Sequence, residues 1–124
     1  MILGHGVDIC DVHRIQLAIE KAENSMLKKI FTEREINYCE AKKTKYQSYS
    51  ARFAVKEAFI KALGTGWSDG ITWTDIETIN DANGKPSVVL YEKAKEKFEA
   101  FGYTNIFVSI SHTKDNVVAS LIFT

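Results

Sequence analysis

The chain has 124 residues, of which 45% are hydrophobic and 26% are charged. This length favours one domain, residues 1–124, with its own core, and the composition is ordinary for a globular protein. No apolar run approaches the ~18 residues of a membrane span, so we expect no membrane partner. The start of the chain lacks the basic and long apolar segments of a signal peptide, so we expect a cytoplasmic protein. Cys10 and Cys39 have no metal-binding spacing and are expected to be free thiols.

Positive charge is concentrated in the first half of the chain. Residues 1–62 hold 11 basic and 8 acidic side chains, whereas residues 63–124 hold 5 and 8. These charges are either solvated helix faces or a docking surface for an anionic partner. The basic residues concerned are Arg14, Lys21, Lys28, Lys29, Lys42, Lys43, Lys45, Arg52, Lys56 and Lys61.

The first forty residues predict a strand followed by two helices. Residues 2–10 are mostly apolar and interrupted by glycines, which favours a strand. Asp11 can cap the helix that follows, where apolar residues recur at helical spacing. Thr32 and Glu35 form a capping box, which predicts a second helix to about Lys42.

A longer helix is predicted from Gln47 to Leu63. Gly64 can adopt its left-handed cap, and Gly66 allows a tight turn after it. Glu57 and Lys61 are four positions apart and therefore share one face of this helix. A face that mixes a carboxylate, an ammonium and bare glycine backbone is poor core material, and it suits the binding of a metal and a phosphate.

The second half predicts strands joined by turns, with one helix among them: strands at 76–79, 86–90, 106–111 and 116–123, and a helix at 91–101. Asn83-Gly84 is a strong hairpin signal between the first two strands. Residues 86–90 could instead begin the helix that follows. An early strand, several helices and then hairpins predict an α+β fold, with an antiparallel sheet packed against the long helix.

Two acidic residues are candidates for metal binding. Asp8 interrupts an apolar strand, where a carboxylate is costly unless it is paired or bound to a metal, although it could also face water on an edge strand. Glu57 could be a surface residue paired with Lys61. Together Asp8 and Glu57 offer the two carboxylates that Mg²⁺ commonly uses while it takes water and phosphate for its other ligands. Lys61 could neutralise a diphosphate, and Gly64 and Gly66 could let backbone approach it.

Other functional classes fit less well. Ser109 and Ser111 alternate with apolar residues, no nucleophile elbow is present, and His112 at a strand end is more often structural, so a hydrolase triad is not predicted. Walker and dinucleotide-binding glycine patterns are absent. Two alternatives remain open: another Mg²⁺-dependent phosphoryl-transfer enzyme, and a nucleic-acid-binding module that uses Lys42–Lys45, Arg52 and nearby tyrosines. The neutral overall charge argues against nucleic acid as a partner.

Five motifs in order give the chain a family resemblance from Met1 to about Phe123. It resembles the bacterial holo-[acyl-carrier-protein] synthases, which are small 4'-phosphopantetheinyl transferases. The motifs are Gly6-Val-Asp8-Ile with Arg14, Arg52-Phe-Ala-Val-Lys-Glu57-Ala with Lys61, Gly64-Thr-Gly66, Asn83-Gly-Lys-Pro86 and Ser109-Ile-Ser-His112-Thr113.

The resemblance implies the family's fold and its reaction, in which coenzyme A donates 4'-phosphopantetheine to a serine of apo-acyl carrier protein, in support of fatty acid biosynthesis. Adenosine 3',5'-bisphosphate is the second product. By resemblance, Asp8 and Glu57 hold Mg²⁺ and Lys61 contacts the transferred phosphate. A water held by the metal or a carboxylate is the favoured proton acceptor, with Glu57 to orient it; Glu35 is a remote candidate for this base.

The resemblance also implies partners. The residues expected to bind coenzyme A are Arg52, Lys61, Gly64, Gly66, Pro86, His112 and Thr113, of which Arg52, His112 and Thr113 would act from a neighbouring subunit of a homotrimer. Arg14 matches a residue that engages the acidic helix of the carrier protein. Lys21, Lys28 and Lys29 extend that basic surface. His13 and Trp67 depart from the family pattern and are interpreted as local variation.

Overall fold

A computed structural model describes residues 1–124. Helices and strands alternate irregularly along the chain, in the order β1 Gly4–Asp11, α1 Val12–Lys21, α2 Leu27–Ile30, α3 Glu33–Glu40, α4 Lys45–Leu63, the 3-10 turn η1 Trp73–Asp75, β2 Ile76–Asn80, β3 Pro86–Leu90, α5 Glu92–Ala100, β4 Ile106–His112 and β5 Asn116–Phe123. Every predicted helix and strand is present, and only the single turn of α2 and the 3-10 turn were not anticipated. No helix combines the length and the hydrophobicity that a membrane span requires.

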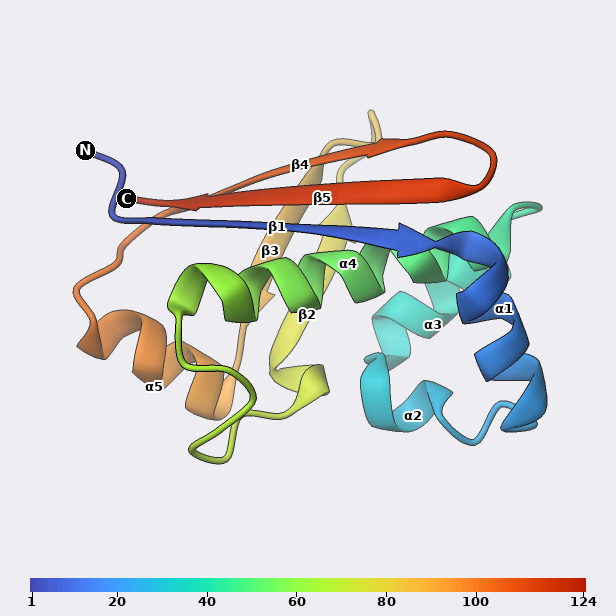
Figure 1. The fold of residues 1–124 in the computed structure, drawn as a ribbon, viewed down its shortest axis with the longest axis horizontal. Coiled ribbons are helices and arrows are strands. Elements are labelled where there is room, and N and C mark those ends of the chain that lie inside the picture. Colours follow the sequence, from blue (N-terminus) through green and yellow to red (C-terminus); the bar gives the residue numbers. More distant parts are fainter.

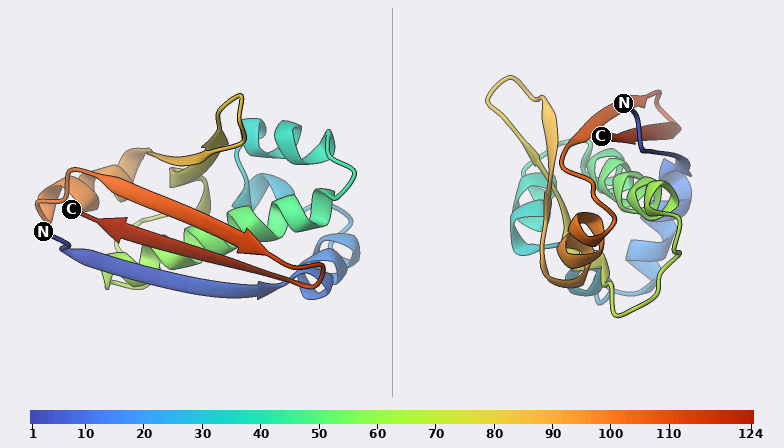
Figure 2. Two further views of the ribbon diagram at one scale, coloured as in Figure 1. Left: turned by 90° about the horizontal axis from the view of Figure 1, so that it is seen from above. Right: turned by 90° about the vertical axis from the view of Figure 1, so that its left-hand side faces the viewer.

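The strands form two antiparallel sheets, and α4 lies against the larger one. Strands β1, β5 and β4 pair in that order, with β5 in the middle, while β2 and β3 form a separate hairpin. Figure 1 shows α4 running beneath the three-stranded sheet, and Figure 2 shows the three strands side by side with α4 behind them. The α+β prediction is therefore confirmed, with two sheets in place of one.

Capping residues define the helix ends as the sequence predicts. The Asp11 side chain accepts a hydrogen bond of 3.0 Å from the Arg14 N–H at the start of α1. Thr32 and Glu35 form the reciprocal capping box of α3. Gly64 ends α4 with φ of 82°, the left-handed conformation that glycine adopts without penalty.

A bare glycine allows β1 to lie directly on α4. A Cβ atom at Gly6 would come within 2.0 Å of the Ala58 carbonyl oxygen, so no other residue fits without displacing the strand. Because side chains alternate along a strand, Gly6 and Cys10 face the helix, whereas Val7 and Ile9 face outward, with 48% and 68% of their surface exposed. Asp8 shares the helix side with Gly6.

Helix α4 is buried on several sides, and two of its basic side chains lie inside the protein. Lys56 and Arg52 are 0% and 3% exposed, which contradicts the expectation that they lie on solvated or docking surfaces. The Lys56 ammonium donates to Glu35 Oε1 at 2.8 Å, to the Trp73 carbonyl at 3.0 Å and to the Ile76 carbonyl. A buried ammonium is tolerated only with such partners, and they come from segments that helix periodicity alone cannot identify.

Candidate active site

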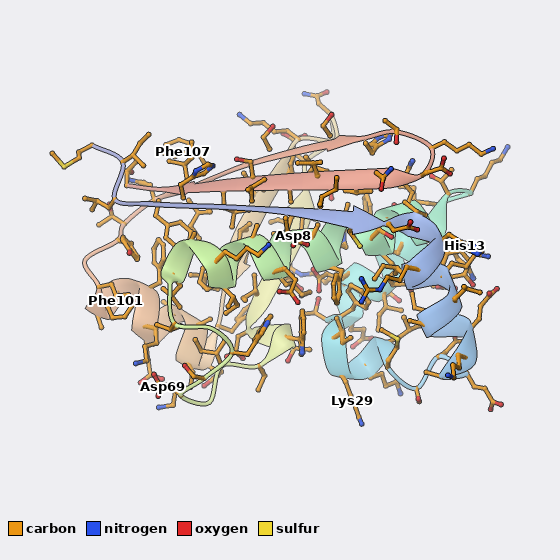
Figure 3. All side chains as sticks on the ribbon, in the orientation of Figure 1. Asp8, His13, Lys29, Asp69, Phe101 and Phe107 are labelled. Atoms are coloured by element: carbon orange, nitrogen blue, oxygen red, sulfur yellow. The ribbon has the colours of Figure 1, made fainter.

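Asp8 and Lys61 meet where β1 crosses α4. The Lys61 ammonium donates to Asp8 Oδ1 at 2.9 Å and to the Val7 carbonyl at 3.2 Å. Figure 3 shows Asp8 at the middle of β1, beside the helix. Helix spacing alone would pair Lys61 with Glu57, yet its only ion pair is with Asp8. The close approach at Gly6 explains this, because it brings β1 within reach of the end of α4.

Glu57 and Asp8 line one pocket of about 370 Å³, together with Arg14 and Phe53. Burial raises the pKa of the Glu57 carboxyl, and the neighbouring Asp8 charge adds to the rise, while the Trp67 indole N–H and Lys61 oppose it. A cation would offset the effect of the Asp8 charge on Glu57, because an opposite charge nearby favours the ionised carboxylate. The predicted pair is therefore brought together.

The donor set fits a hard divalent cation with an incomplete protein shell. No group of three or more His, Cys, Asp or Glu side chains in the molecule could hold a metal. A cation at Asp8 and Glu57 would therefore take most of its ligands from water and substrate, which is the usual behaviour of Mg²⁺ and not of structural Zn²⁺.

Cys10 lines the same pocket but is unsuited to nucleophilic chemistry. Burial raises the pKa of its thiol to about 11, and the Asp8 charge acts in the same direction. The thiolate, which is the reactive form, is therefore scarce at neutral pH. Cys39 is also buried, and both cysteines are free, as predicted.

A second cluster gathers most of the residues predicted to bind coenzyme A. Arg52, Pro86 and His112 line a pocket of about 240 Å³. The Arg52 guanidinium donates to Asn80 Oδ1, and its Nε atom is buried without a partner. Thr113 follows His112, at the end of β4. Arg52 therefore places a cation with unused hydrogen-bonding capacity beside this pocket, and such a cation suits a phosphate.

The two clusters lie on different sides of α4. Arg52 and Glu57 are five positions apart, which is about 140° around a helix, and the two pockets share no lining residue. Gly64 and Gly66 follow the helix with φ of 82° and 69°, and no atom lies within 4 Å of either missing Cβ. Their backbone is open to a ligand at the end of α4 that carries Lys61.

The basic residues predicted to dock the carrier protein lie on two separate surfaces. Arg14 lines the Asp8 pocket, and Lys21 lies seven positions further along α1, on the same face of the helix. Lys28 lies on α2 and lines a separate groove with Thr32 and Asn37. Arg14 and Lys21 thus form one exposed basic face beside the pocket, which Lys28 does not share.

Glu35 is excluded as a general base. It is fully buried, Oε1 accepts from Lys56 and from the Thr32 N–H, and Oε2 accepts from the Thr78 N–H at 2.9 Å. A carboxylate with both oxygens engaged inside the core cannot reach a substrate. Its capping role was evident from the sequence, whereas its partner Lys56 lies 21 positions away.

Trp67 belongs to the site, whereas the sequence pattern indicates only local variation at this position. It lies beside Glu57 and packs on Trp73, with ring centroids 3.9 Å apart. A large aromatic residue directly after a Gly-Thr-Gly turn was the available signal, because a solvated turn has no need of one.

Comparisons with known proteins agree with this geometry. Residues 4–120 match the 4'-phosphopantetheinyl transferase superfamily. The chain is 46% identical over 122 residues to the holo-[acyl-carrier-protein] synthase of Geotalea daltonii, covering 98% of each chain. The crystal structure of the Neisseria meningitidis synthase is 32% identical, with a TM-score of 0.89 and coverage of 100% and 99%.

A third comparison involves a ligand. The Helicobacter pylori synthase, solved in complex with coenzyme A, is 28% identical, with a TM-score of 0.84 and coverage of 97% and 99%. The chain therefore belongs to the 4'-phosphopantetheinyl transferase superfamily, and within it to the holo-[acyl-carrier-protein] synthases. The predictions of family and fold are confirmed.

Proposed function

We propose that Asp8, Glu57 and Lys61 carry out the reaction of this family in the cytoplasm: transfer of 4'-phosphopantetheine from coenzyme A to a serine of apo-acyl carrier protein, which activates the carrier for fatty acid biosynthesis. The chain is an enzyme of the holo-[acyl-carrier-protein] synthase family. The observation that carries the residue assignment is the convergence of two acids, 49 positions apart in the sequence, on one pocket beside a lysine.

The chemistry is an in-line displacement at phosphorus. The serine oxygen attacks the β-phosphorus of coenzyme A, a P–O bond forms, and the P–O bond to the nucleotide breaks, so that adenosine 3',5'-bisphosphate departs. Negative charge grows on the bridging and non-bridging oxygens. Mg²⁺, when bound, supplies charge neutralisation to the diphosphate.

The residues have distinct roles in this reaction. Asp8 and Glu57 would hold the cation in the pocket, and the Lys61 ammonium would turn from Asp8 toward the transferred phosphate. The serine proton passes to a water that Glu57 orients. The bare backbone at Gly64 and Gly66 lets the diphosphate approach the end of α4.

A complete coenzyme A site requires two copies of the chain. Arg52, His112 and Thr113 lie across α4 from Glu57, so the nucleotide end would be held by a neighbouring copy in a homotrimer. An apolar patch of Val7, Ile9 and Phe107 on the outer face of the three-stranded sheet supports this assembly, because monomers rarely leave such a face uncovered. Figure 3 shows Phe107 on the side of the sheet away from α4.

The carrier protein would dock on α1. Arg14 lies at the rim of the Asp8 pocket, and Lys21 continues the same helix face. A basic face next to the reacting atoms suits an acidic helix of the carrier that presents its serine to the pocket.

A mass-shift assay tests the reaction. The protein is incubated with coenzyme A, Mg²⁺ and apo-acyl carrier protein, and the carrier should gain about 340 Da, the estimated mass of one phosphopantetheine arm on the modified serine. The gain should disappear with a chelator. Nucleotide release without carrier modification would favour another phosphoryl-transfer enzyme, and salt-sensitive binding of single-stranded nucleic acid without coenzyme A binding would favour the nucleic-acid module.

A further inference from the structure

Trp67 belongs to a stack of three aromatic rings beside the Asp8 pocket. Its ring lies against Trp73, at 3.9 Å between centroids and 34° between planes. Trp73 in turn stacks on Phe53, at 5.2 Å and 18°. Phe53 lines the pocket one turn before Glu57 on α4. Gly64 and Gly66 precede Trp67 and have positive φ angles, so the chain can turn back after α4 and place Trp67 beside that helix.

The stack is fixed from within the core. The fully buried Lys56 ammonium donates to the Trp73 carbonyl at 3.0 Å, so the middle residue of the stack is tied to α4. Lys56 is also held by Glu35. Trp67 therefore rests on a ring whose backbone is anchored to the helix that carries Glu57.

The Trp67 indole N–H has no hydrogen-bond partner. Its nitrogen is buried, and the indole can only donate. A buried donor left unsatisfied costs roughly 1–3 kcal/mol, so such a group calls for an explanation. The neighbouring acceptor is Glu57, whose charged form the indole N–H favours, although the two do not complete a hydrogen bond in the structure.

We propose that Trp67 is a positioning residue for Glu57: its indole N–H donates to one carboxylate oxygen when Glu57 holds the cation, which leaves the other oxygen free as the ligand. This inference rests on the proposed metal site. A metal-binding carboxylate is usually oriented by a neighbouring donor, and a rigid stacked ring holds that donor at one place and angle. Within the aromatic stack, Trp67 is the residue whose N–H acts on the Glu57 carboxyl.

Single-tryptophan variants provide the test, because the sequence contains only two tryptophans. Trp67→Phe keeps a ring in the stack and removes the N–H beside Glu57. Trp73→Phe is the matched control, since it keeps a ring and leaves that N–H in place. Mg²⁺ binding is measured by calorimetry with coenzyme A present and no carrier protein, so that no turnover occurs. In parallel, the fluorescence of the remaining tryptophan is followed.

The inference predicts a specific pattern. Trp67→Phe should weaken Mg²⁺ binding by about tenfold or more, as for other residues that orient metal ligands. Its thermal midpoint without metal should change little, because the lost ring contacts and the removal of an unsatisfied buried donor have opposite effects on stability. Trp73→Phe should bind Mg²⁺ like the parent, and its remaining Trp67 fluorescence should respond to Mg²⁺. The fluorescence of Trp67→Phe should respond less.

Contrary results separate the two proposals. If the parent binds Mg²⁺ and Trp67→Phe binds it equally well, the positioning role is overturned and the metal site stands. If Trp67→Phe and Trp73→Phe weaken Mg²⁺ binding equally, the effect comes from packing of the aromatic rings, and the inference is also overturned. If the parent itself binds no Mg²⁺, the metal site fails, and the positioning role fails with it.

Discussion

Lys61 Nζ lies 2.9 Å from Asp8 Oδ1, although the two residues are 53 positions apart in the sequence. This pair joins the edge strand β1 to the last turns of α4. The lysine side chain is 54% exposed, and exposed ion pairs contribute only about 0–1 kcal/mol. Lys61 can therefore leave Asp8 for a substrate phosphate at little energetic cost, while the burial of β1 against α4 keeps the backbone in place.

Removing either acid should abolish transfer. Asp8→Ala and Glu57→Ala should each lower the rate at least about a hundredfold, which is the scale for losing one preorganised charge-stabilising group. The mass shift of the carrier protein measures the rate, and circular dichroism verifies the fold. Asp11→Asn is a matched control, because Asp11 lines the same pocket yet serves as a helix cap, a role that asparagine retains. Near-normal rates in both alanine variants with Mg²⁺ would refute the metal assignment.

Reversing the charge of Arg14 should affect one substrate only. Arg14→Glu places repulsion at the rim of the pocket, and we expect KM for the carrier protein to rise by about tenfold or more while KM for coenzyme A stays unchanged. Steady-state kinetics with each substrate varied in turn provide the measurement. Lys95→Glu, an exposed charge reversal on α5, controls for the change in net charge. An equal effect on both substrates would contradict the docking role.

Adding a methyl group at Gly6 should separate β1 from α4. Gly6→Ala places Cβ 2.0 Å from the Ala58 carbonyl oxygen, and this backbone clash should lower the free energy of unfolding by about 1–3 kcal/mol or more. Gly4→Ala is the matched control on the same strand, since its Cβ would lie 3.1 Å from the Ala62 carbonyl oxygen, and it should be milder. Urea unfolding monitored by circular dichroism measures both. Equal stability of the two variants would disprove the tight contact.

Removing one charge of the buried Lys56–Glu35 pair should destabilise the protein more than removing both charges. Lys56→Met leaves the Glu35 carboxylate uncompensated in the core and should lower the free energy of unfolding by about 3–5 kcal/mol. The double variant Lys56→Met with Glu35→Gln removes both charges and should recover part of that loss. Chemical denaturation of the parent, the single variants Lys56→Met and Glu35→Gln, and the double variant tests this. A double variant as unstable as the sum of the two single changes would argue against coupling.

The apo protein should be more stable with Glu57 neutral. Because the folded-state pKa of Glu57 is raised above its value in the unfolded chain, its contribution to stability is present at low pH and is lost as pH rises through the folded-state pKa. Glu57→Gln should therefore raise the thermal midpoint in a chelating buffer at pH 7, with a smaller difference near pH 4. Differential scanning calorimetry at both pH values measures the effect. A lower midpoint at pH 7 would contradict the raised pKa.

Local interactions explain which parts of the fold could be predicted from the sequence. Asp11, Thr32 and Gly64 mark helix ends through contacts within a few residues, and the alternation in 106–111 defines one face of a strand in the same way. The order of the five motifs was equally readable and identified the family. These features depend on neighbours along the chain, so the sequence contains them directly.

Tertiary packing alone decided the rest. Lys56 and Lys61 are both helix lysines, yet one is buried against Glu35 and the other is half exposed on Asp8. Helix spacing could not distinguish them, because the desolvation of each ammonium depends on segments at least 17 residues away. The return of Trp67 to α4, beside Glu57, likewise arises from how distant elements pack around one buried helix.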